Sequence, residues 1–183
     1  MANTNTFMFG MVLEDEYMKA YKFYDHDDRS DSEYDIEGEN FDLLIALALK
    51  YCKYFSLAYS ESIKPVKELE PFEFDFEPNK ELRQKWEYYE VFHSRFPRKY
   101  YILTPESASV LRNIADGIFK FTFAFGYEKP EDPAFFRDDD SAFFVSVVHE
   151  GECCIFEKNN EDVHKLIESS GQWHELPLSK TSW

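Results

Sequence analysis

Phenylalanine recurs at every second position in two stretches of this chain, and that spacing constrains the fold more than any other feature. The stretches are EPFEFDFEP at residues 70–78 and FKFTFAF at 119–125. Successive side chains of a β-strand point to opposite faces, so a period of two predicts a strand with one apolar face. Pro71 and Pro78 bracket the first stretch, which indicates a short strand at a sheet edge.

The aromatic content is combined with an unusually acidic charge balance. Aromatic residues make up 19% of the 183 residues, while 36 acidic and 20 basic residues give a formal net charge of −16. A high net charge favours disorder, but this many aromatic side chains can build a core. We therefore expect a folded chain, of a length that fits one domain, with a strongly negative surface.

Proline, glycine and helix-capping residues mark the expected boundaries of the other helices and strands. Helix N-termini are indicated where a capping residue precedes a run with helical spacing, and strands where apolar residues alternate or cluster. The order of elements predicts an α+β fold, a single domain over residues 1–183 with a mainly antiparallel sheet and about four helices. The expected helices cover about 40–51, which should be central to the core, then 79–92, 105–117 and 161–169, and the expected strands include a half-buried one at 53–62, 98–104 and three within 133–157.

Acidic residues gather near the N-terminus. Residues 14–39 hold 11 acidic and 3 basic residues, a net charge of −8 and half of the total. The part at about 24–40 is poor in aliphatic residues and is expected to be exposed. Tyrosines among carboxylates suit a surface that binds a basic protein, and a solvated loop is the alternative. The candidate binding residues are Tyr24, Asp25, Asp27, Asp28, Asp31, Glu33, Tyr34 and Asp35.

The charge also argues against several classes of partner. Phosphate backbones and anionic lipids attract clustered Lys and Arg, and no long basic run is present. We expect neither direct nucleic-acid binding nor membrane association. The N-terminus lacks the basic start of a signal peptide, and three cysteines form a poor disulfide framework, so a cytoplasmic location is expected.

Two clusters could hold a metal ion, and in both the pattern argues against it. Cys153 and Cys154 are adjacent, so on a strand they face opposite sides and cannot both bind one zinc ion with His149 or His164. Asp138–Asp140 lacks the alternating acids and the glycine of a calcium loop and is typical of a hairpin turn. We predict no metal and no cofactor.

Catalysis has only a weak basis in the sequence. Ser146 and His149 are three positions apart and face opposite sides of a regular strand, and the chain has no nucleophile elbow and no phosphate-binding loop. An enzyme is therefore disfavoured but not excluded. The alternative kept open is a small enzyme or ligand-binding domain with a pocket near Arg137, His149 and Glu150.

The C-terminal third resembles a group of small bacterial proteins without an assigned activity. In these proteins a helix that begins with Thr-Pro leads to a proline-acidic loop, a strand ending in Arg-Asp-Asp and a strand ending in His-Glu. The resemblance implies a bacterial origin and a structural hairpin in which Arg137 pairs with Glu150. The matching residues are Thr104, Pro105, Pro130, Glu131, Asp132, Phe136, Arg137, Asp138, Asp139, Ser146, His149 and Glu150.

The sequence therefore favours a binding protein over an enzyme. The specific hypothesis is an immunity-type protein that neutralises a basic toxin, such as a nuclease, through its acidic surface. The alternatives are the pocket described above and an acidic mimic of nucleic acid. The identity of the partner and the oligomeric state stay open.

Overall fold

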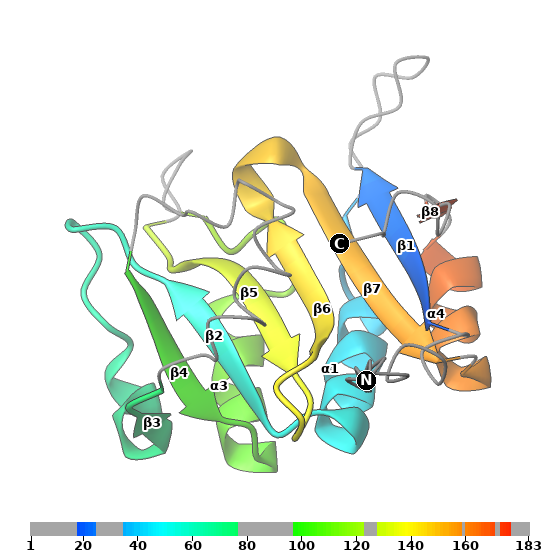
Figure 1. Ribbon diagram of the computed structural model, residues 1–183. Helices are drawn as coiled ribbons and strands as arrows, with labels where there is room; N and C mark the ends of the chain where they lie inside the picture. Colours follow the sequence, from blue (N-terminus) through cyan, green and yellow to red (C-terminus); the bar gives the residue numbers. More distant parts are fainter. Residues whose placement is uncertain are drawn as a thin grey trace, which may run out of the picture.

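A single antiparallel sheet of eight strands organises the computed structural model, which describes residues 18–24, 35–76, 97–122, 128–158, 160–170 and 173–176 (Figure 1). The strand order is β3-β4-β2-β5-β6-β7-β1-β8, and every neighbouring pair is antiparallel. The predicted α+β fold is thus confirmed. The strands are β1 (Met18–Tyr24), β2 (Tyr54–Ala58), β3 (Glu73–Phe74), β4 (Arg98–Ile102), β5 (Glu131–Phe136), β6 (Ala142–Val147), β7 (Glu152–Lys158) and β8 (Trp173–Leu176).

The strands β5, β6 and β7 form the meander that the sequence predicts. Asp138–Asp140 makes the turn between β5 and β6, where Asp139 Oδ1 accepts hydrogen bonds from both the backbone N–H and the hydroxyl of Ser141. Asp140 has a φ of 65°, a left-handed conformation that Asp tolerates. The Asp139 carboxylate therefore stabilises the turn itself, as the sequence indicates, whereas Asp140 Oδ1 accepts a 3.0 Å hydrogen bond from the Tyr54 hydroxyl of β2.

Three α-helices lie in the described part of the chain: α1 (Glu39–Tyr51), α3 (Pro105–Ile114) and α4 (Glu161–Ser170). Thr104 caps α3 through a hydrogen bond from Ser107 N, with Pro105 in the first turn, as predicted. Gly38 occupies the N-cap position of α1. The predicted helix at 79–92 lies outside the described residues.

Helix α3 ends earlier than the predicted range of 105–117. The helix stops at Ile114, and Gly117 forms an isolated β-bridge with Glu37. A Cβ atom at Gly117 would lie 2.3 Å from Asp35 Oδ2, so the glycine is needed for the close approach of two chain segments.

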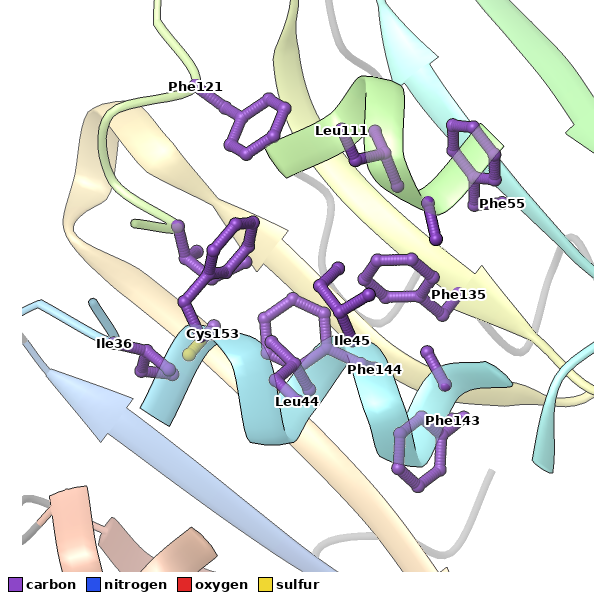
Figure 2. Close-up of a cluster of buried hydrophobic side chains, with 14 of the residues drawn as sticks. Ile36, Leu44, Ile45, Phe55, Leu111, Phe121, Phe135, Phe143, Phe144 and Cys153 are labelled. Atoms are coloured by element: carbon purple, nitrogen blue, oxygen red, sulfur yellow. The ribbon is translucent and has the colours of Figure 1, made fainter. Parts of the chain in front are cut away.

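The main core lies between the helices and one face of the sheet. Leu44 and Ile45 of α1 are fully buried and pack toward Phe55, Phe135 and Phe144 of the sheet (Figure 2). Helix α1 therefore occupies the central position that its apolar sequence predicts. None of the described helices is long and apolar enough to cross a membrane.

A second, mostly aromatic cluster lies on the opposite face of the sheet. It contains Tyr54, Ala134, Phe136, Val145 and Cys154, together with partly buried residues such as Phe74 and Tyr100. Strand β2 is thus buried on both faces, which corrects the prediction of a half-buried strand; its central place between β4 and β5 is the reason. Cys153 and Cys154 do face opposite sides of the sheet, as predicted, and both are buried.

Within the described residues, the two stretches of alternating phenylalanine form less strand than predicted. In the first, η1 (Lys67–Phe72), a 3₁₀ helix, precedes β3, which has two residues and does lie at the sheet edge. In the second, Phe119–Thr122 is turn and irregular chain, and 123–127 lies outside the described residues. Phe121 instead packs against Phe41 of α1, with ring centroids 6.1 Å apart, so tertiary packing overrides the local alternation.

Candidate functional site

The acidic segment predicted to bind a partner is fixed at both of its ends. On one side Tyr24 ends β1, opposite Glu152 of β7, and on the other side Ile36 is fully buried. Ile36 O accepts a hydrogen bond of 3.2 Å from Ile118 N. The candidates Asp25, Asp27, Asp28, Asp31, Glu33 and Tyr34 lie outside the described residues, as does the side chain of Tyr24.

Asp35 is the candidate whose side chain the structure places, and it serves the fold. Asp35 Oδ1 accepts a 3.1 Å hydrogen bond from Phe119 N, and Asp35 Oδ2 faces the hydrogen-only side of Gly117. Burial raises the pKa of the Asp35 carboxyl, and the hydrogen bond from Phe119 N opposes that effect. Its carboxylate joins the chain before α1 to the chain after α3. We therefore remove Asp35 from the predicted binding surface.

Further carboxylates surround the end of the acidic segment at α1. We call Glu37, Glu39, Asp42 and Asp116 the acidic root; Glu37, Asp42 and Asp116 have side chains 57%, 64% and 77% exposed. Lys120 Nζ lies 2.7 Å from Glu37 and 3.2 Å from Asp116, and Arg112 Nε lies 2.6 Å from Asp42. Four acids against two bases leave the acidic root negative beside the still more acidic sequence of residues 25–34.

The proposed pocket residues are not brought together. The Arg137 guanidinium donates to the carbonyls of Ala142 and Phe156, at the start of β6, and lies over the Phe143 ring. His149 belongs to η4 (Val148–Glu150), the 3₁₀ turn that follows the other end of β6. The whole of β6 separates Arg137 from His149, so the predicted pocket shared by Arg137, His149 and Glu150 is wrong; the side chain of Glu150, and with it the predicted Arg137–Glu150 pair, lies outside the described residues.

A buried charged cluster lies at the end of the sheet where His149 is found, and the sequence analysis missed it. Arg98 Nη1 donates to Ser56 Oγ and to Asp132 O, each at 2.9 Å, while Arg98 Nη2 lies 3.9 Å from Asp132 Oδ2. Asp132 Oδ1 accepts a 2.8 Å hydrogen bond from Val148 N, which fixes η4. Burial lowers the pKa of Arg98, and the charge of Asp132 opposes that effect.

The sequence gives only a weak indication of this buried charged cluster. Arg98 shares a strand face with Tyr100, but alternation alone does not say whether that face is buried. Asp132 was singled out only through the resemblance, and its φ of 50° is visible only in the structure. Whether the Arg98 side chain is buried depends on which strands lie beside β4, and that is a property of the tertiary fold.

The groups that could act as nucleophiles are held in structural roles. Ser146 Oγ is buried and donates to the carbonyl of Pro133 at 2.8 Å, so its proton is directed at the backbone rather than at an imidazole. Burial raises the pKa of the thiols of Cys52 and Cys153, which keeps them protonated. Among the described residues, the Ser146 hydroxyl therefore has a structural role, and the thiols of Cys52 and Cys153 are not activated.

The metal-ligand types are likewise dispersed among the described residues. No group of three His, Cys, Asp or Glu side chains in the described ranges is arranged to hold a metal ion. His164, considered with Cys153 and Cys154 as a ligand, instead lies 3.0 Å from the buried carboxylate of Glu157.

Comparisons with known proteins do not add a function. The chain matches no family model, no curated protein and no solved structure. Its function must therefore be argued from its own residues.

Proposed function

We propose that this protein is a non-catalytic, cytosolic binding protein that recognises a basic protein through residues 25–34 and the adjoining acidic root. The observation that carries the proposal is the density of charge between two fixed ends. Residues 25–34 hold five carboxylates and one arginine, a net charge of −4, between Tyr24 of β1 and the buried Ile36.

Physical chemistry links this charge to association rather than to folding. The stretch carries little apolar surface, so it contributes little to a core. A concentrated negative field raises the rate at which a basic partner arrives, and the effect falls as salt screens it. Tyr24 and Tyr34, one at each end, supply the aromatic contact area that protein interfaces favour.

The specific form of the proposal is an immunity-type protein that covers a basic toxin such as a nuclease. An acidic protein that competes with nucleic acid for a nuclease must present carboxylates where the substrate presents phosphates. Three free cysteines suit the reducing cytosol in which such a protein would meet its partner.

The test compares two variants that lose the same number of charges. The first carries Asp25→Asn, Asp27→Asn, Asp28→Asn, Asp31→Asn and Glu33→Gln. The matched control neutralises five exposed acids elsewhere, Glu61, Glu68, Glu70, Asp75 and Glu168. Proteins captured from a lysate of the source cells by the wild type are identified and purified, and their association and dissociation rates are measured at about 20 mM and about 300 mM salt.

We expect a partner with a basic isoelectric point. At low salt this partner should associate more slowly with the first variant than with the wild type. The control variant should associate nearly as fast as the wild type, and dissociation should change less than association. Equal association rates for the two variants would remove residues 25–34 as the interaction surface. The immunity form is tested in cells that express the partner as a toxin. Co-expression of the wild type should protect these cells, and co-expression of the first variant should not. A partner that binds nucleic acid in competition with this protein but harms no host would favour the nucleic-acid mimic.

A further inference from the structure

A carboxylate is buried where strand β7 leads into helix α4. Glu157 has a side chain that is 0% exposed, and Glu157 Oε2 accepts a 2.7 Å hydrogen bond from Asn160 N at the start of α4. Glu157 Oε1 is also buried and has no hydrogen-bond partner among the described residues. A buried carboxylate with one unsatisfied oxygen is costly, so its charge needs compensation from nearby.

The imidazole of His164 approaches this oxygen. His164 Nε2 lies 3.0 Å from Glu157 Oε1, but the contact does not have the alignment of a hydrogen bond. The attraction therefore depends on the charge of the imidazole rather than on a shared N–H. The side chain of His164 is 35% exposed, so its imidazole reaches solvent, whereas the side chain of Glu157 is fully buried.

The surroundings of the pair contain charges of both signs. The ring of Tyr21 from β1 packs edge-on against His164, with centroids 5.9 Å apart. Lys19 is the β1 register partner of Glu157, and Glu175 of β8 is that of Tyr21. On α4, Glu161 and Glu168 are three and four positions from His164, on the same side of the helix. Lys50 of α1 and Lys165 of α4 are paired with Asp162.

We propose that Glu157 and His164 form a proton-sensitive latch that holds α4 against β7 more tightly in acid than in alkali. A protonated imidazole compensates the buried carboxylate, and loss of that proton leaves Glu157 Oε1 without compensation. An imidazole is the side chain whose ordinary pKa lies between about pH 5 and 8, so the latch is tested across that range.

The latch reaches beyond α4 itself. Asp162 of α4 pairs with Lys50 at the end of α1, and Ser169 Oγ donates a 2.6 Å hydrogen bond to Asn40 Oδ1 in the first turn of α1. Figure 1 shows α4 beside β1 and β7 at one end of the sheet. Release of α4 therefore also weakens its contacts with the start and the end of α1. This inference does not rest on the proposed binding function.

Hydrogen exchange of backbone amides measures the latch directly. Opening constants for the amides of α4 are compared at about pH 5.5 and about pH 8 after correction for the chemical exchange rate, with α3 as the internal reference. Wild type should show roughly fivefold larger opening constants in α4 at the higher pH. This factor corresponds to the attraction between two unit charges about 4 Å apart in water, which is the lower limit for the pair. The amides of α3 should show no such change.

Variants assign the effect to the pair. His164→Gln and Glu157→Gln should each abolish the pH dependence of α4, whereas His149→Gln, beyond the opposite end of β7, and Lys19→Gln should retain it. His164 is partly exposed, so His164→Gln decides the matter even if Glu157→Gln does not fold. A pH dependence that persists in His164→Gln, or a wild-type α4 that opens equally at both pH values, refutes the latch.

Discussion

The buried pair of Arg98 and Asp132 gives the sharpest prediction about stability. Their side chains are 13% and 4% exposed, and Arg98 also bonds Ser56 Oγ and the backbone carbonyl of Asp132. Arg98→Met removes the positive charge and its hydrogen bonds and leaves a buried carboxylate. Asp132→Asn removes only the negative charge, because Asn can still accept the hydrogen bond from Val148 N and tolerates the φ of 50°.

Because Arg98→Met removes more interactions than Asp132→Asn, we expect it to lower the free energy of unfolding by more. Breaking a buried ion pair by removing one partner costs about 3–5 kcal/mol, and we expect that for Arg98→Met. The 3.9 Å separation of Nη2 and Oδ2 gives roughly 4 kcal/mol of attraction at an intermediate effective dielectric constant, so Asp132→Asn should cost about 2–4 kcal/mol. The double variant has no uncompensated charge, so its loss should fall short of the sum by at least about 1 kcal/mol.

Equilibrium unfolding in urea, followed by circular dichroism, measures these free energies. Arg112→Met is the matched control, because Arg112 is 35% exposed and pairs with an Asp42 that is 64% exposed; it should cost less than about 1 kcal/mol. Losses below about 1 kcal/mol for both single variants, or a double variant equal to their sum, would show that the cluster carries no coupled buried charge.

Three further predictions concern the core and the end of the acidic segment. Leu44→Ala should lower the free energy of unfolding by about 2–5 kcal/mol because Leu44 is fully buried in α1; a loss below about 1 kcal/mol in urea unfolding would contradict its place in the core. Gly117→Ala should cost about 1–3 kcal/mol because its Cβ would lie 2.3 Å from Asp35 Oδ2, and Asp35→Ser should restore part of the loss in a thermal melt. Asp35→Asn should gain stability relative to wild type as the pH rises above the ordinary carboxyl pKa of 3.8, because burial raises the pKa of Asp35 and wild type loses that stability as the group ionises; a wild-type-minus-variant difference independent of pH between about 3 and 7 would exclude this.

Much of the fold is written in local sequence patterns. The β5–β6–β7 meander follows from apolar clusters separated by an Asp-rich turn and Gly151, and α3 from Thr104 and Pro105 at its start. Helix α1 follows from an apolar run of strong helix formers. These signals act within a few residues, so one sequence suffices to detect them.

The candidate sites depended more on the fold. Asp35 looked like one more surface carboxylate, yet it bonds Phe119, which is 84 positions away. Arg137 and His149 are close in sequence, but β6 carries them to opposite ends of a strand. Arg98 and Asp132 come together only because β2 lies between β4 and β5, with Ser56 as their neighbour.

The sequence by itself determined the fold class, the main helices and strands and the concentration of negative charge near the N-terminus, because periodicity, capping and composition are local properties. Only the tertiary structure decided that β2 is buried on both faces, that Asp35 supports the fold and that the side chains of Glu157 and Arg98 are buried. The physical reason is that burial and electrostatic compensation depend on which strands and helices become neighbours, and residues far apart in the chain supply those neighbours.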